Sequence, residues 1–228
     1  HLRTRRIHPP EEEPVKLTVH ALSRIFSGVF PTRALGLFHE DLMTARRRDP
    51  AATSSLEIAL TYPGVHALWT HRVSHALWQF GAHTPARALS SVARAVTGVD
   101  IHPEAQIGRR VFIDHATGVV IGQTAQVGND VVIFHGVTLG GVAMTPGKRH
   151  PTVGDHVMIG AGAKVLGPIT VGTGVKIGAN AVVVKDVPCG NVAIGVPARL
   201  LPKPEKDTRD RDLIVDPSYF FEEPALYI

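Results

Sequence analysis

The sequence predicts an α+β protein in which a small α-helical domain precedes a parallel β-helix. Between residues 101 and 187 an aliphatic residue returns every six positions, the next position is often glycine, and the position four after it is small or β-branched. A helix repeats every 3.6 residues and a strand alternates every two, so neither explains a strict six. A six-residue repeat is the signature of a β-helix, in which three hexads close one triangular coil. The aliphatic positions are Ile101, Ile107, Ile113, Ile121, Val127, Ile133, Leu139, Val153, Ile159, Val165, Val171, Ile177 and Val183.

The repeat is interrupted twice, and both interruptions carry polar, titratable residues. Ile113 and Ile121 are eight residues apart, and Leu139 and Val153 are fourteen apart, which is two more than two hexads. Extra residues inside a stacked coil would break the column of aliphatic side chains, so we expect them to project outward. The segments 114–118 (Asp-His-Ala-Thr-Gly) and 147–151 (Gly-Lys-Arg-His-Pro) are therefore the first candidates for a functional site.

The composition indicates which broad class of protein the chain belongs to. The 228 residues are 44% hydrophobic and 19% charged, which is ordinary for a soluble globular protein. The single cysteine, Cys189, allows no internal disulfide and favours a reducing cytoplasm. The sequence has no apolar run long enough to span a membrane. The formal charge is +4, but the short arginine clusters carry no interleaved aromatics, which argues against a nucleic-acid partner.

The chain divides into four predicted parts. Residues 1–31 form a poorly ordered lead, 32–98 a helical N-terminal domain, 99–200 the β-helix, and 201–228 a tail. Within the helical part, spacing and punctuation predict helices from Thr32 towards Arg46, near Ser55–Leu60, over Val65–Phe80, and from about Pro85 to Val96, with a turn at Tyr62-Pro63-Gly64 and an end at Gly98.

His71 and His75 are four residues apart on the third predicted helix, a spacing compatible with a metal pair. No acidic or cysteine third ligand is near in sequence, so we expect surface or packed histidines and no metal.

An ordered set of motifs across roughly residues 34–200 resembles the serine acetyltransferase family. The motifs are Val99-Asp100-Ile101-His102-Pro103, Asp114-His115-Ala116-Thr117-Gly118, Val137-Thr138-Leu139-Gly140-Gly141, Arg149-His150-Pro151, Ile159-Gly160-Ala161-Gly162-Ala163-Lys164 and Gly195-Val196-Pro197-Ala198-Arg199. The resemblance implies a left-handed β-helix. It also implies transfer of acetyl from acetyl-CoA to the L-serine hydroxyl, which gives O-acetylserine for cysteine synthesis, with no metal.

The resemblance implies that His115 is the general base and that Asp100 orients it. The chemistry is reasonable, because a neutral imidazole accepts the serine proton near pH 7 and a carboxylate on its other nitrogen fixes the tautomer. Counted in hexads, His135 stacks on His115 and is interpreted as a wall of the site. His102 and His156 are interpreted as structural.

The substrate is a zwitterion, so its site needs both signs of charge. Arg149 offers a planar fork for the carboxylate, while Asp114 and Asp49 offer acceptors for the ammonium. Together with His150, these residues match the family's serine-binding positions. L-Cysteine resembles serine closely enough to occupy the same pocket, and we expect it to inhibit competitively.

Acetyl-CoA must lie along the coils, where small residues leave a groove and lysines could meet its phosphates. The candidate contacts are Gly140, Gly141, Ala161, Gly162, Ala179, Lys164 and Lys176. Each glycine could equally serve corner geometry, and each lysine could be solvated surface.

Assembly and partners also follow from the resemblance. β-Helices of this family form trimers with active sites between subunits, so a trimer is favoured, with a hexamer as the alternative. The tail ends in Leu226-Tyr227-Ile228, and Ile228 is expected to bind O-acetylserine sulfhydrylase.

Three other hypotheses about the function compete with serine acetylation. A hexapeptide acetyltransferase acting on a sugar or xenobiotic hydroxyl would lack the Asp100, Asp114 and Arg149 set. A γ-type carbonic anhydrase would need histidines at metal-binding spacing, which the sequence does not show. A non-catalytic protein that only docks a sulfhydrylase would not need an intact Asp100–His115 pair.

Overall fold

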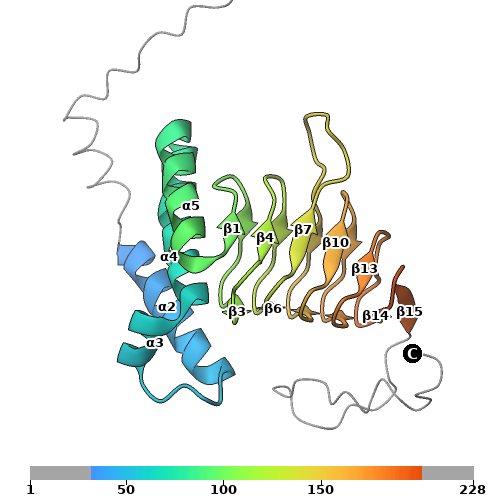
Figure 1. Cartoon of the computed structure of the whole chain (residues 1–228), viewed down its shortest axis with the longest axis horizontal. Coiled ribbons are helices and arrows are strands. Elements are labelled where there is room, and N and C mark those ends of the chain that lie inside the picture. Colours follow the sequence, from blue (N-terminus) through green and yellow to red (C-terminus); the bar gives the residue numbers. More distant parts are fainter. Residues whose placement is uncertain (1–31, 202–228) are drawn as a thin grey trace, which may run out of the picture. The chain divides into compact units, whose positions relative to one another are not determined.

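The computed structural model describes residues 32–201 of the chain (Figure 1). Among the described residues, those from Leu37 on belong to one compact unit, and the few before it belong to another. The predicted lead and all but the first residue of the predicted tail, with Ile228, lie outside the described residues. From Leu37 on, helices and coils belong to one unit, so the proposed domain boundary near Gly98 stays a prediction.

Within the described residues four helices precede the coils, as the sequence predicts. They are α2 (Thr32–Arg48), α3 (Ser55–Thr61), α4 (Pro63–Gln79) and α5 (His83–Thr97). Helix α3 begins with a capping box, in which Ser54 and Glu57 bond each other's backbone N–H groups. Helix α5 ends at Gly98, whose φ of 72° is the left-handed conformation typical of a helix end.

One predicted detail of the helices is wrong. Pro63 and Gly64 belong to the first turn of α4 rather than to a separate turn. Proline suits this place because the first N–H groups of a helix have no intrahelical partner. Helix α5 begins at His83, two residues before Pro85.

The rest of the described chain is a β-helix of three parallel sheets, which confirms the predicted fold class. One sheet holds β1 (Asp100–Ile101), β4 (Val120–Ile121), β7 (Thr138–Gly140), β10 (Lys164–Leu166) and β13 (Val182–Val183). The second holds β2 (Gln106–Ile107), β5 (Gln126–Val127), β8 (Thr152–Val153) and β11 (Thr170–Val171). The third holds β3 (Phe112–Asp114), β6 (Val132–Phe134), β9 (Met158–Ile159), β12 (Lys176–Ile177), β14 (Val192–Ile194) and the antiparallel β15 (Arg199–Leu201).

The aliphatic positions of the repeat form the core. In the first sheet the strand register stacks Ile101, Ile121, Leu139, Val165 and Val183 in one buried column. Each such burial stabilises the fold by about 1.5–3 kcal/mol. The glycine that follows an aliphatic position lets neighbouring coils approach closely: a Cβ on Gly108 would lie 2.4 Å from the carbonyl oxygen of Gly128.

Two corners of the triangular coil position the candidate site. The histidine corner joins the third sheet to the first and includes residues 115–119 and 135–137. The loop corner joins the first sheet to the second and includes residues 122–125 and 141–151. The long loop after β7 projects beyond the coils (Figure 1).

The helices pack directly on the first coil. Helix α4 contacts β3 and helix α5 contacts β1. Arg72 of α4 bonds the Asp41 carboxylate of α2 and also donates to the carbonyl oxygens of Ile107 and Gly108. This buried ion pair ties two helices to the coil backbone.

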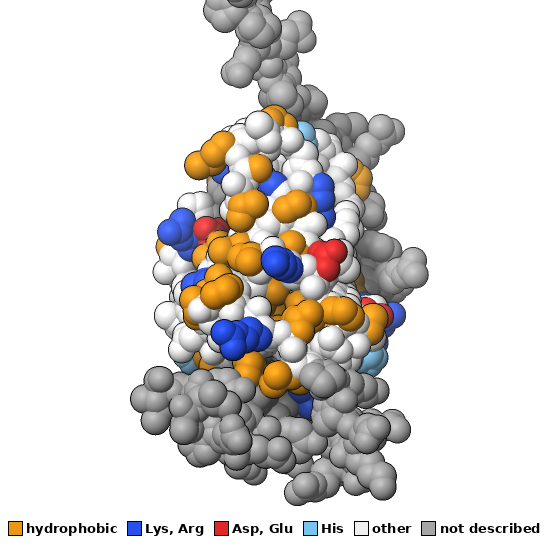
Figure 2. Space-filling model, turned by 90° about the vertical axis from the view of Figure 1, so that its right-hand side faces the viewer, with side chains coloured by type: hydrophobic (Ala, Val, Ile, Leu, Met, Phe, Trp, Pro, Cys, Tyr) orange, Lys and Arg blue, Asp and Glu red, His pale blue; other side chains and the backbone are white. Residues whose placement is uncertain are grey.

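At the other end of the coils, Figure 2 shows hydrophobic side chains interspersed with Lys and Arg rather than a single basic patch. The exposed apolar residues of the last coil and β15 include Val184, Val196 and Leu200. None of the described helices has the length and apolarity that crossing a bilayer requires.

Candidate functional site

The first interruption of the repeat forms an outward bulge at the histidine corner. The register pairs Asp114 with Phe134 before the corner and Val120 with Thr138 after it, so the earlier coil carries two extra residues. His115 and Ala116 have φ values of 54° and 51°, a left-handed conformation that is costly for residues other than glycine. Ala116 is fully buried while the His115 side chain is 75% exposed. The bulge therefore presents the imidazole to solvent.

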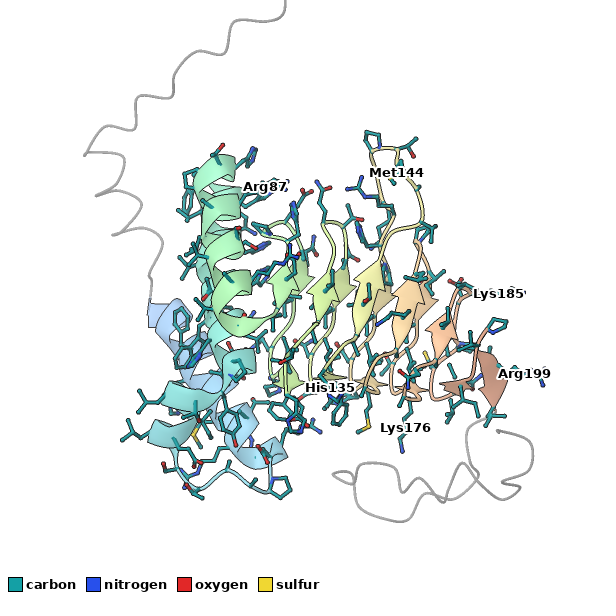
Figure 3. The ribbon with its side chains drawn as sticks, in the orientation of Figure 1. Arg87, His135, Met144, Lys176, Lys185 and Arg199 are labelled. Carbon is teal, nitrogen blue, oxygen red and sulfur yellow. The ribbon has the colours of Figure 1, made fainter. Side chains whose placement is uncertain are left out.

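Two side chains border His115. Its Nε2 lies 3.8 Å from Oδ2 of Asp114, the residue before it. The His135 ring, one coil further on, meets the His115 ring edge to face with centroids 5.9 Å apart. The predicted stack of these two histidines is confirmed. Figure 3 shows His135 at the edge of the coils that faces the ends of the helices.

The junction of α3 and α4 brings a third polar group to this region. The Tyr62 hydroxyl donates to Oδ2 of Asp49 at 2.6 Å, and its ring packs in a cluster with Phe112 and Phe134. The bond to Asp49, then burial, then the negative charges of Asp49, Glu57 and Asp114 raise the pKa of Tyr62 to about 12. Asp49 and Asp114 thus both act on the same tyrosine, although 65 residues separate them in sequence.

Asp100 lies at the same corner as His115, at the start of β1. Its backbone N–H donates to the carbonyl of Val119 in the bulged corner. Within the described chain its carboxylate forms an ion pair with Arg94 of α5 at 3.4 Å. Orientation of His115 by Asp100 stays a prediction.

Arg149 and His150 belong to the loop corner. Arg149 donates to Oε1 of Gln123 at 2.7 Å, and Nδ1 of the buried His150 accepts the backbone N–H of Thr124 at 3.2 Å. Burial, followed by the charges of Arg149 and Lys148, lowers the pKa of His150. Within one chain this corner is separate from the histidine corner: Met144, in the projecting loop, and His135 lie at opposite edges in Figure 3.

The candidate acetyl-CoA residues divide between the two corners. Ala161 and Ala179 continue the column above His135, as the bonds from Gly162 to His135 and from Asn180 to Ala161 show. Gly162 lies beside Ala161, whereas Gly140 and Gly141 lead into the loop corner. Lys164 donates to the carbonyl of Gly136 at the histidine corner. Lys176 projects from the same edge as His135 (Figure 3).

His71 and His75 of α4 are packed residues. Their ring centroids are 5.5 Å apart, and His71 is buried with its Nδ1 unbonded by any protein atom of the described chain. Across residues 32–201, no three His, Cys, Asp or Glu side chains are grouped to hold a metal ion.

Tyr62 is the site residue that sequence reasoning missed. The sequence predicts only a turn at Tyr62-Pro63-Gly64, although Asp49-Pro50 lies shortly before it along the chain. The hydrogen bond between them depends on how α2 and α3 pack, which local spacing does not give.

Comparison with known proteins adds independent information. Residues 150–185 match the family model for bacterial transferase hexapeptide (six repeats). A serine acetyltransferase of Mycobacterium tuberculosis is 65% identical over 161 residues, which are 71% of this chain and 70% of the relative. The Neisseria gonorrhoeae serine acetyltransferase solved in complex with serine has a TM-score of 0.74 and 42% identity, over 84% of this chain and 78% of that one. A serine acetyltransferase solved in complex with cysteine has a TM-score of 0.76 and 40% identity, over 84% and 76%.

Proposed function

Because the chain belongs to the serine acetyltransferase family of hexapeptide-repeat acyltransferases, we propose that His115 is the general base of its serine acetylation. The reaction gives O-acetyl-L-serine and CoA, a step of cysteine biosynthesis. The observation that carries the proposal is the exposed imidazole on a strained two-residue bulge, with the carboxylate of Asp114 beside it.

In the proposed mechanism, His115 on the bulge takes part in the acetyl transfer itself. The serine hydroxyl oxygen attacks the thioester carbonyl of acetyl-CoA while Nε2 of His115 takes the hydroxyl proton. The tetrahedral intermediate then expels the CoA thiolate, which receives that proton from the imidazolium. Asp100 fixes the imidazole in this proposal, and its pair with Arg94 must rearrange for it to do so.

Substrate binding needs two copies of the chain. Asp49 and Asp114 accept the ammonium group at the histidine corner, and Arg149 and His150 hold the carboxylate. Since the latter pair lies at another corner of the same chain, we propose that a neighbouring copy supplies them. A threefold arrangement would place the loop corner of one chain beside the histidine corner of the next and repeat that contact three times. A trimer is therefore favoured, with a hexamer as the alternative.

In this proposal, acetyl-CoA binds along the column of small residues that continues from His135 into the later coils. Ala161, Gly162 and Ala179 leave the groove, and Gly140 and Gly141 of the neighbouring copy line its other side. Lys164 and Lys176 are the candidate phosphate contacts.

The assay follows thiol release from acetyl-CoA with and without L-serine. Serine-dependent release is expected from the wild type, and His115→Ala should lose about 10²–10⁴-fold in kcat with an unchanged oligomer. His39→Ala, at an exposed residue of α2, is the matched control. Thiol release that does not rise when L-serine is added would reject the proposal, and a rise when a sugar is added in its place would favour a sugar hydroxyl as the acceptor.

Inhibition and partner binding are separate proposals. A relative is solved with cysteine, and L-cysteine should raise the apparent KM for serine here without changing kcat at saturating serine. Binding of O-acetylserine sulfhydrylase through the segment 226–228 is tested by removal of Ile228. This change should abolish the complex and leave acetyl transfer intact.

A further inference from the structure

Tyr62 occupies a special place between the helices and the coils. It caps the N-terminus of α4, and two residues later Gly64 rests directly on the carbonyl group of Ile113 in β3. Asp114 follows Ile113 and His115 follows Asp114. The backbone that carries Tyr62 is therefore fixed against the strand that carries the bulge.

The hydroxyl of Tyr62 gives the Asp49 carboxylate its second hydrogen bond. Oδ1 accepts the backbone N–H of Ala51 at 2.8 Å, and Oδ2 accepts the Tyr62 hydroxyl at 2.6 Å. Both carboxylate oxygens are thus held from the helix side. Each ionised oxygen can accept more than one hydrogen bond, so a substrate ammonium can still bind.

We propose that Tyr62 is a positioning residue that fixes the Asp49 carboxylate for the ammonium group of the amino-acid substrate. The inference rests on the proposed function, in which Asp49 receives that ammonium. Asp49 lies just after the end of α2, and the bond from Tyr62 holds the carboxylate oxygen that the backbone N–H of Ala51 does not hold. Loss of the Tyr62 hydroxyl would leave Oδ2 without this restraint.

Tyr62 stays protonated, so its hydroxyl can act as a hydrogen-bond donor. Because its pKa is raised to about 12, mainly by the bond to Asp49 and by burial, the hydroxyl keeps its proton at every pH where the enzyme would be assayed. Tyr62 therefore does not compete with His115 as a base. Its effect should appear in serine binding rather than in the chemical step.

The test is Tyr62→Phe, which removes the hydroxyl and keeps the ring in its apolar cluster. A hydrogen bond to a charged group is lost, so the KM for L-serine should rise about tenfold. The KM for acetyl-CoA and kcat should change by less than about twofold. Thr61→Val is the matched control, because it removes the hydroxyl of the preceding residue, which lies at the end of α3 and donates to the Glu57 carbonyl.

A double-mutant cycle separates positioning from general packing. Asp49→Asn should itself raise the KM for serine, and adding Tyr62→Phe should then raise it by no more than about twofold, since the two residues act as a unit. Thermal unfolding of each variant monitors the fold. Additive effects, or an unchanged serine KM in Tyr62→Phe, would overturn the inference, whereas a wild type without serine-dependent activity would overturn the proposed function instead.

Discussion

Gly64 in the first turn of α4 packs against the backbone of Ile113 in β3. A Cβ on Gly64 would lie 2.1 Å from the Ile113 carbonyl oxygen and 3.1 Å from its Cβ. No side chain fits into this contact, so the helix and the strand approach as closely as their backbones allow. The candidate site lies on both sides of it, with Tyr62 before the glycine and His115 after the isoleucine.

Gly64→Ala should destabilise the fold by about 2–3 kcal/mol, because an extra carbon forces the helix away from the strand. Chemical denaturation measures the loss. Gly36→Ala is the control: its Cβ would meet no described atom within 4 Å, and alanine in a helix should be neutral or stabilising by up to about 1 kcal/mol. Equal unfolding midpoints for wild type and Gly64→Ala would contradict the close contact.

The proposed sharing of the site between copies predicts complementation. His115→Ala and Arg149→Ala should each be inactive alone. When they are coexpressed with different tags and assemble at random, some sites receive His115 from one chain and Arg149 from the next, which should restore about a quarter of wild-type activity.

The control for complementation mixes His115→Ala with Asp114→Ala. These residues are adjacent in one chain, so no mixed assembly contains both intact at one site, and activity should stay absent. Recovery by this pair, or no recovery by the first pair, would be evidence against a shared site.

Buried His71 should make the fold sensitive to mild acid. Burial, with the charges of His75, Arg72 and His102, lowers the pKa of His71 to about 3, while a backbone bond with Ala105 opposes the shift. As the pH falls from about 6.5 towards 3, His71 is protonated in the unfolded chain but stays neutral in the folded chain. The free energy of unfolding therefore falls over that pH range.

We expect this histidine to contribute a slope of up to about 1.4 kcal/mol per pH unit to the free energy of unfolding. Denaturant unfolding between pH 6.5 and 5, above the range of ordinary carboxyl groups, measures it. His71→Gln should flatten the slope whatever its effect at neutral pH, and exposed His39→Gln should not. An unchanged slope in His71→Gln would rule out this origin of acid sensitivity.

The repeating part of the fold follows from the sequence because its determinants are local and periodic. Each aliphatic position stacks on its counterpart one coil away, so the spacing of Ile113 and Ile133 was enough to predict that His115 and His135 would meet. The bulge was also predictable, since two extra residues have no place inside the column.

Contacts between helices and coils depend instead on residues that are distant in sequence. Arg72 and Asp41 are 31 residues apart, and nothing in the sequence indicates that they form an ion pair. Tyr62 is recognisable in the sequence only as a residue before a proline, with no sign of its bond to Asp49. The placement of Arg149 is limited in another way. A single chain holds it at the loop corner, and in the proposed shared site a second copy brings it to His115.

The coil register also restricts how the length of this chain can change in evolution. Val120 and Thr138 are one coil apart and eighteen residues apart. A six-residue insertion within the coils would move every later side chain to the next corner and separate Ala161 and Ala179 from the histidines. A whole-coil insertion would preserve the corners and only lengthen the column. Viable length variants should therefore differ by entire coils, or by loops at a corner, as the segment 141–151 does here.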